Sequence, residues 1–160
     1  MAKTNTIAKL PAAEMLKLDH QLCFALYSSS LAMTKLYKPL LDPLGLTYPQ
    51  YLAMLVLWEG DAVSVSELGQ RLQLDSGTLT PLLKRLEASG WVERERDSAD
   101  ERRVRVHLTP AGRALKARAA KVPPQVLCAT GCSLAEIAAL TTQLKTLRDE
   151  IQSFSQAAAA

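Results

Sequence analysis

The sequence contains no apolar run that approaches the roughly 20 residues needed to span a bilayer. Its first residues, Met1 to Leu10, are polar and basic and lack the apolar segment of a secretory signal. We therefore expect a cytoplasmic protein with no membrane partner.

Cysteine and histidine are both scarce. The chain has three cysteines, Cys23, Cys128 and Cys132, which form no C-x-x-C pair, and its two histidines are His20 and His107. In a reducing compartment such cysteines are thiols more often than structural disulfides. Ligands this few and this far apart argue against a zinc site, and we expect neither a metal nor another cofactor.

The excess of positive over negative charge is also small, with a formal net charge of only +3. Its distribution is more informative than its total. Residues 66–121 hold 12 Lys or Arg and 8 Asp or Glu, whereas the rest of the chain holds 7 and 8. All of the excess positive charge thus lies in the middle segment, as expected if this segment meets phosphates.

What the sequence has in abundance is helical patterning, and we predict a mainly α fold. The first helix is predicted from about Ala13 to Leu40, ended by Pro39 and Pro43. Its apolar stripe is Met15, Leu18, Leu22, Leu26, Met33, Leu36 and Leu40. At about 40 Å, such a helix is longer than one domain can cover, so part of it is expected to pack on a partner chain.

The middle of the chain predicts a winged helix-turn-helix. A helix follows the N-cap Thr47, and a short helix ending at Leu72 follows Ser64, with Ser66 as a rival N-cap. The turn 75–77 leads into a second helix that closes at Gly90. Strands are predicted at 91–95 and 104–108, joined by a charged tip at 96–103.

Two further helices are predicted after the strands. One is capped by Thr109 with Pro110 and reaches about Ala129, where Gly131 breaks it. The last helix follows a capping box that starts at Ser133. Its apolar residues, spaced by three and four, are Ile137, Leu140, Leu144, Leu147, Ile151 and Phe154.

The second helix of the helix-turn-helix is the expected DNA-reading element, because a major groove admits one helix while the ribbon reaches a neighbouring minor groove. The predicted DNA contacts are Ser76, Thr78, Lys84, Arg85, Arg94, Arg102 and Arg103. Taken alone, the charged hairpin would more often be a solvated face; its place directly after the two helices favours DNA. We expect Leu79, Leu82, Leu83 and Leu86 to be core.

Several motifs resemble the MarR family of dimeric repressors. They are Val65-Ser66-Glu67-Leu68 through Gly90, Asp100-Glu101-Arg102, and Leu108-Thr109-Pro110-Ala111-Gly112. Four further segments resemble one subgroup of the family, the organic-hydroperoxide-responsive OhrR proteins. They are Leu18 to Tyr27, Tyr37 to Leu41, Tyr48-Pro49-Gln50-Tyr51 and Leu74 to Pro81. The resemblance implies a single unit over 1–160, with dimerisation helices at 14–45 and 110–156 and a winged-helix region at 48–108.

A second stripe on the first predicted helix consists of residues with thiol and hydroxyl groups. Its members, four and three residues apart, are Cys23, Tyr27, Ser30, Thr34 and Tyr37. Cys23 and Tyr37 are about 21 Å apart along one helix, so they cannot touch within it. If two copies cross antiparallel near Ser30, Cys23 of one approaches Tyr37 of the other. A phenol that donates to a thiolate favours the charged form, and only the thiolate attacks peroxide.

The resemblance adds further roles. It implies Tyr48 as a second donor to Cys23, and its two-cysteine members imply a disulfide from Cys23 to Cys128 of the other subunit. Cys132 is left as a spare thiol or a mixed-disulfide site. We expect Tyr27, Tyr51 and Trp58 to be core, and His20 and His107 to be ordinary surface or hairpin residues.

Three functions compete at this point. The first is a repressor of a pseudo-palindromic operator that an organic hydroperoxide inactivates through Cys23. The second is a repressor released by a reversible small ligand, in which Cys23 is an inert apolar residue. The third is a thiol peroxidase, for which no feature of turnover is visible and which leaves the DNA-binding module unexplained.

Overall fold

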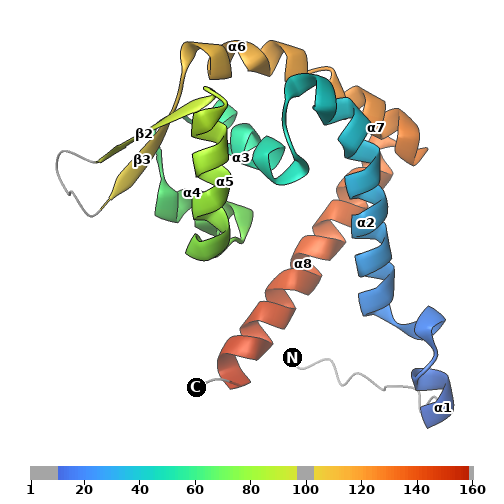
Figure 1. Ribbon diagram of the computed structural model, residues 1–160. Helices are drawn as coiled ribbons and strands as arrows, with labels where there is room; N and C mark the ends of the chain where they lie inside the picture. Colours follow the sequence, from blue (N-terminus) through green and yellow to red (C-terminus); the bar gives the residue numbers. More distant parts are fainter. Residues whose placement is uncertain (1–10, 97–102, 159–160) are drawn as a thin grey trace. The chain divides into compact units, whose positions relative to one another are not determined.

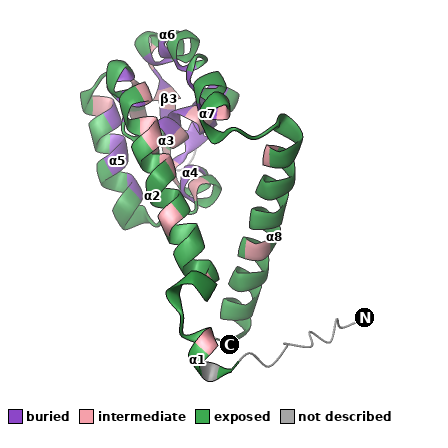
Figure 2. Cartoon of the chain, turned by 90° about the vertical axis from the view of Figure 1, so that its right-hand side faces the viewer, coloured by how far each residue is buried: buried purple, intermediate pink, exposed green. Residues whose placement is uncertain are grey.

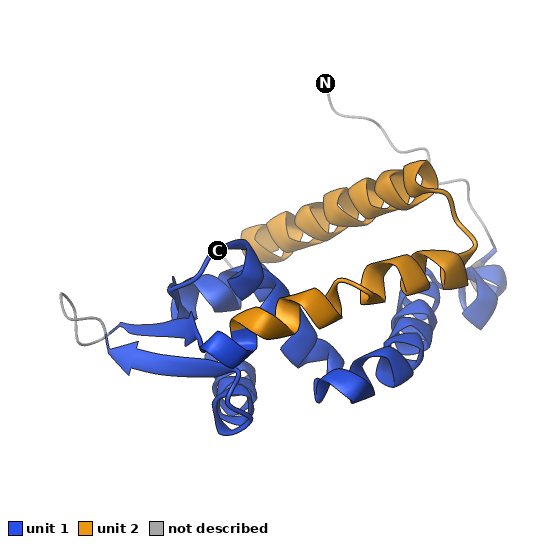
Figure 3. Ribbon diagram, turned by 90° about the horizontal axis from the view of Figure 1, so that it is seen from above, with its two compact units in different colours: residues 1–112 blue, residues 113–160 orange. Residues whose placement is uncertain are grey.

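The computed structural model describes residues 11–96 and 103–158. The chain divides into two compact units, residues 1–112 and 113–160, coloured separately in Figure 3 and described separately below. The helices of unit 1 are α1 (Ala12–Met15), the 3-10 turn η1 (Leu18–His20), α2 (Leu22–Leu41), η2 (Asp42–Leu44), α3 (Tyr48–Glu59), α4 (Val65–Leu72) and α5 (Ser76–Ala88). Its strands are β1 (Val63–Ser64), β2 (Val92–Arg96) and β3 (Val104–Leu108).

The first predicted helix is broken. The prediction of one helix from Ala13 to Leu40 is wrong, because α1 ends at Met15 and α2 begins only at Leu22. Side chains of His20 and Gln21 bind backbone carbonyls that a continuous helix would use for its own ladder. Pro39 does not end the helix either: it lies inside α2, which stops at Leu41, two residues before Pro43. A proline removes one donor from a helix without always breaking it.

The helix-turn-helix forms as predicted. Ser64, rather than Ser66, is the N-cap of α4, and its hydroxyl accepts a hydrogen bond of 3.2 Å from the backbone N–H of Glu67. Gln73 adopts a left-handed conformation (φ 56°) at the C-cap of α4, which turns the chain toward α5. The core between these elements contains Leu68, Leu79, Leu83, Leu86, Val92 and Val106, none more than 1% exposed.

The wing is a three-stranded antiparallel sheet in the order β1-β3-β2, where the sequence predicted only the hairpin. Val92 pairs with Leu108 and Arg96 with Val104, while Val63 of β1 pairs with Val106 on the other edge of β3. Figure 1 shows β2 and β3 reaching past α4 and α5 as a ribbon. The predicted DNA contact Arg102 lies outside the described residues.

Unit 2 contains the end of α6 (Pro110–Ala119), α7 (Val122–Thr130) and α8 (Leu134–Ala158). The prediction of one helix to Ala129 is wrong, because α6 stops at Ala119 and α7 starts afresh at Val122 with Pro123 and Pro124 behind it. Prolines lack the N–H that continues a helix but fit its first turn.

Helix α8 begins as predicted, and none of its residues is fully buried. Ser133 and Glu136 form the capping box, with the Glu136 carboxylate 2.8 Å from the backbone nitrogen and 2.7 Å from the hydroxyl of Ser133. None of the 25 residues of α8 is buried, as Figure 2 makes visible along its length. No single helix among the described residues is long and apolar enough to cross a membrane; the pair Pro110–Thr130 and Leu134–Ala158 meets the length and composition requirement only together, with a 93° bend between them.

Candidate functional site

The start of α5 is held by its N-cap. The carboxylate of Asp75 accepts hydrogen bonds from the backbone N–H of Thr78 at 2.9 Å and from its hydroxyl at 2.8 Å. These bonds hold the pKa of Asp75 below its usual value. The hydroxyl of Thr80 donates to the carbonyl of Ser76 at 2.7 Å. The first turn is therefore ordered, and its small residues are exposed.

The two faces of α5 separate as predicted. Leu79, Leu82, Leu83 and Leu86 are all buried, which confirms that they are core. The predicted DNA contacts Ser76, Thr78, Lys84 and Arg85 are all exposed. Lys84 and Arg85 follow the first turn by one to two helical turns, so α5 presents small polar residues and then cations along one exposed surface.

Arg94 is tied to α5 by an ion pair. Its Nε donates to Oε2 of Glu87 at 3.0 Å, its Nη2 contacts the same oxygen, and its backbone N–H donates to Oε1 at 3.2 Å. The hydrogen bonds and charge of Arg94 hold the pKa of the Glu87 carboxyl below its usual value. Arg94 therefore connects the wing to the last turn of α5. Arg103, the residue before β3, is exposed.

A cavity of about 830 Å³ lies between α4, α5 and the wing. Its polar lining includes Ser64, Ser66, Thr80, Arg94 and Arg103, and its apolar lining includes Leu74 and Leu83. The cavity therefore adjoins the exposed residues of α5 and offers both cationic and hydroxyl groups to a small molecule.

Three tyrosines form a cluster between α2 and α3. The ring of Tyr37 lies 4.7 Å from that of Tyr48 and 5.8 Å from that of Tyr51, measured between centroids. Tyr51 in turn meets Trp58 edge-on at 6.4 Å. Tyr51 and Trp58 are buried, which confirms them as core. Tyr37 and Tyr48 are half-buried, so the two predicted donors lie together in one chain with partial access to solvent.

The surroundings raise the pKa of both phenols. Burial, followed by the neighbouring Tyr48 and Tyr51, raises the pKa of Tyr37 above its usual value. Burial likewise raises the pKa of Tyr48. A phenol that retains its proton at neutral pH is a hydrogen-bond donor, which is the state that stabilises an anion nearby.

Cys23 is the second residue of α2, within its first turn, and is exposed. This position follows from the break before Leu22, which the sequence did not reveal. The structure does not bring Cys23 to Tyr37 in one chain, because both lie on α2, 14 residues apart. Tyr27 is 61% exposed, so the prediction that it is core is wrong for the single chain.

The other two cysteines lie at the end of α7. Cys128 is in its last turn, and Cys132 follows the left-handed C-cap Gly131, with Sγ 3.5 Å from the carbonyl oxygen of Thr130. Both are exposed thiols. No group of three or more His, Cys, Asp or Glu that could hold a metal ion occurs among residues 11–96 and 103–158.

The sequence analysis did not single out two residues, Glu87 on α5 and Gln21 before α2, whose side chains make contacts that shape the structure. Glu87 could have been suspected, because a carboxylate seven residues before Arg94 spans the turn between α5 and β2. Gln21 gives no such signal, because a glutamine in an amphipathic stretch is a good helix former.

Comparisons with known proteins agree on one family. The family model described as transcriptional regulator SarA/Rot matches residues 35–119. The regulator TtmR of Methylorubrum extorquens is 54% identical over 84% of this chain and 69% of its own length. The organic hydroperoxide resistance transcriptional regulator of Bacillus subtilis is 48% identical over 85% of this chain and 92% of its own.

Solved structures give the same result. The crystal structure of AbfR of Staphylococcus epidermidis matches with a TM-score of 0.72 and 35% identity, over 88% of this chain and 98% of AbfR. AbfR is also known in reduced form bound to DNA (TM-score 0.69, 34% identity) and in a disulfide form (TM-score 0.57, 37% identity). These matches confirm the predicted winged-helix fold.

Proposed function

The chain belongs to the MarR family of winged-helix transcriptional regulators and is related to its OhrR members, and from this premise we propose that it is a dimeric repressor inactivated by organic hydroperoxides. Oxidation of Cys23, followed by a disulfide to Cys128 of the partner subunit, ends DNA binding. Such a regulator acts in the cytoplasm, where its operator is, and needs no cofactor.

DNA binding is supported by the exposed surface of α5 and by the basic wing. The proposed contacts are Ser76, Thr78, Lys84, Arg85, Arg102 and Arg103. For Arg94, which the sequence also predicted as a contact, we propose instead that it braces the wing through its ion pair with Glu87. The exposed cations of α5 can pair with phosphates, and arginines suit a narrow minor groove. Two reading helices in a dimer would address half-sites about 34–36 Å apart, so the operator is a pseudo-palindrome. Reduced AbfR has been solved bound to DNA.

Dimerisation through the helices at 14–45 and 110–156 is supported by apolar side chains left exposed. On α8 these are Leu134, Leu140, Leu144, Ile151 and Phe154, and on the first helices Met15, Leu18, Leu22, Phe24, Leu26 and Leu31. A monomer rarely exposes so many large apolar residues on two elements, whereas a subunit interface would bury them.

The redox proposal assembles Cys23 with donors from a second copy. An antiparallel crossing of two α2 helices near Ser30 brings Tyr37 and Tyr48 of the partner subunit to Cys23. The first turn of α2 adds free N–H groups and the positive end of the helix dipole, both of which favour an anion.

The chemistry balances without a cofactor. The Cys23 thiolate attacks a peroxide oxygen, the O–O bond breaks, and the alkoxide leaves and takes a proton, which gives the sulfenic acid and an alcohol. The thiol of Cys128 of the partner subunit then attacks the sulfenic sulfur, and the disulfide forms as water leaves. Apolar neighbours such as Leu22 and Phe24 favour alkyl over hydrogen peroxide.

One observation carries this proposal. The ring centroids of Tyr37 and Tyr48 lie 4.7 Å apart, in a chain that is 48% identical to a regulator named for organic hydroperoxide resistance.

The test is a gel-shift titration of the reduced protein on its own promoter. Cumene hydroperoxide is expected to release the DNA and to convert monomers to linked dimers on non-reducing electrophoresis. Cys23→Ser should bind DNA and ignore peroxide, whereas Cys128→Ser should stop at the sulfenic acid without linked dimers. Unchanged induction of Cys23→Ser refutes the redox mechanism.

A second candidate is favoured by the cavity beside α5. A small anionic ligand that binds Arg94 and Arg103 there could displace DNA reversibly without using a cysteine. The same Cys23→Ser variant separates the two functions: under this alternative, a ligand releases wild-type and variant protein equally.

A further inference from the structure

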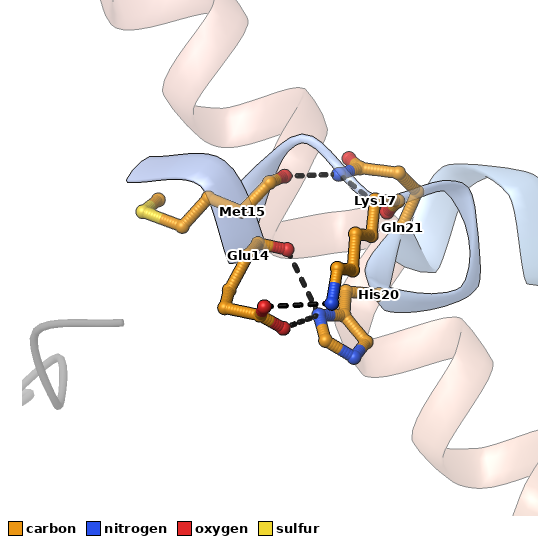
Figure 4. Close-up of polar contacts among 5 residues, drawn as sticks. All are labelled: Glu14, Met15, Lys17, His20 and Gln21. Atoms are coloured by element: carbon orange, nitrogen blue, oxygen red, sulfur yellow. Dashed lines mark hydrogen bonds and ion pairs between the residues drawn. The ribbon is translucent and has the colours of Figure 1, made fainter. Parts of the chain in front are cut away.

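The break before α2 depends on a compact turn, residues 12–21, drawn in Figure 4. The ring nitrogen Nδ1 of His20 lies 2.8 Å from the carbonyl oxygen of Glu14, and Nζ of Lys17 lies 2.6 Å from Oε1 of Glu14. The amide nitrogen of Gln21 donates to the carbonyl of Met15 and, at 3.3 Å, to that of Lys17.

These are the carbonyls that a continuous helix would need. In an α-helix the carbonyl of residue 15 accepts from the N–H of residue 19, and that of residue 17 from the N–H of residue 21. No glycine or proline lies between Ala12 and Lys38, and the apolar spacing runs unbroken across the turn. The stretch thus contains no helix-breaking residue, and the side chains of His20 and Gln21 occupy carbonyls of the helical ladder.

Gln21 is the residue on which the break depends most directly. It occupies the N-cap position of α2 with an extended backbone (φ −90°, ψ 111°), and its side chain caps nothing in α2 because it reaches back to the preceding turn. The backbone N–H groups of Phe24 and Ala25 both bond to the carbonyl of Gln21, which fixes where the ladder of α2 begins.

The position of Cys23 follows from this start. With α2 beginning at Leu22, Cys23 lies in the first turn, where N–H groups lack partners within the helix and the dipole is positive. In a helix continuous from Ala13, Cys23 would lie in the third turn, where the ladder consumes those groups.

We propose that Gln21 is a positioning residue for the peroxide reaction: it starts α2 at Leu22 and so keeps Cys23 in the first turn. This inference rests on the proposed function of Cys23. It assigns to Gln21 no contact with the peroxide itself.

The test uses full-length protein in a Cys128→Ser, Cys132→Ser background, so that Cys23 is the only thiol. Gln21→Met keeps the length of the side chain and removes both donors. The matched control is Gln125→Met, because the Gln125 amide makes a similar exposed bond, 2.9 Å, to the carbonyl of Lys121. Three quantities are measured: the rate of sulfenic acid formation, the pH profile of iodoacetamide alkylation, and the helical circular dichroism.

Gln21→Met is expected to slow oxidation at pH 7 by about two- to fivefold, the size of a helix-terminus effect. Its alkylation profile should move to higher pH and its helical signal should rise, while reduced protein binds the operator as before. The control should match the parent. His20→Ala, which loosens the same turn, should shift the profile in the same direction.

A Gln21→Met variant with the parent's rate and alkylation profile overturns the inference. A variant that loses thermal stability and operator affinity with an unchanged profile also overturns it, because that result indicates a merely structural role. Failure of the proposed function is a separate result: Cys23→Ser would then respond to peroxide as the wild type does.

Discussion

Gly112 lies where two tryptophans meet the start of α6. The indole N–H of Trp58 donates to the Gly112 carbonyl at 2.9 Å, and a Cβ built on Gly112 would stand 2.0 Å from the carbonyl oxygen of Trp91. No side-chain rotation relieves a clash between two backbones. We expect Gly112→Ala to lower the free energy of unfolding by about 1–3 kcal/mol, the usual cost of overpacking. Urea unfolding measures it. Gly60→Ala, with nothing within 4 Å of the added Cβ, should cost far less.

The ion pair between Arg94 and Glu87 allows a structural role of Arg94 to be distinguished from a DNA contact. A cation that meets a phosphate contributes about one to the slope of log affinity against log salt. Because the Arg94 guanidinium already pairs with Glu87, we expect Arg94→Ala and Glu87→Gln to weaken operator binding with little change in that slope. Lys84→Ala should reduce the slope by about one. A reduced slope for Arg94→Ala would instead place Arg94 on a phosphate.

At the scale of elements, the tyrosine cluster predicts how the packing of α2 on α3 responds to alkali. Burial raises the pKa of Tyr37, Tyr48 and Tyr51 above the usual value of 10.0. The folded state therefore holds these protons more tightly than the unfolded state. Their contribution to stability is complete below pH 10 and is lost as pH rises through the raised folded values.

The measurement is urea unfolding at pH 8 and at pH 10.5. Wild-type protein should lose stability between the two, and Tyr48→Phe should lose less. Tyr27→Phe, at an exposed tyrosine outside the cluster, should behave as wild type. An equal loss in Tyr48→Phe would contradict the assignment to this cluster.

The elements also show what the sequence could and could not predict. Helices with a predicted capping residue at their start, such as α3 after Thr47 and α8 after Ser133, were predicted closely, because a cap is a local signal. The break before α2 was missed, since it depends on how Gln21 folds back. Strand β1 was missed because two residues carry no periodicity and pair only with distant β3.

At the scale of the whole molecule, the proposed redox site needs residues from two subunits. Tyr37 and Tyr48 were predicted as partners of Cys23, and their mutual contact is now observed. The approach of Cys23 to them needs a second copy, and no reasoning from one chain supplies its placement. The reading surface of α5 was predictable for the opposite reason: its core and exposed faces follow from helical spacing alone.

The exposed apolar residues of α8 predict the effect of breaking the assembly. Leu144→Asp with Ile151→Asp should leave a particle with the 17.5 kDa mass of one chain in light scattering and should weaken operator binding by more than tenfold. Charges are costly to bury in an apolar interface. Lys145→Asp, a charge change on the same helix, is the control and should remain dimeric. A double variant of unchanged mass would locate the interface elsewhere.

A helix of 25 residues with no fully buried residue in its own chain has a consequence for the gene that the protein would control. If the subunits pair only through such surfaces and separate when scarce, the amount of paired protein grows with the square of the free chain. Halving the copy number would then cut promoter occupancy about fourfold at the low end. Dilution of the protein by cell division would therefore raise transcription of the controlled gene even where no oxidant is present.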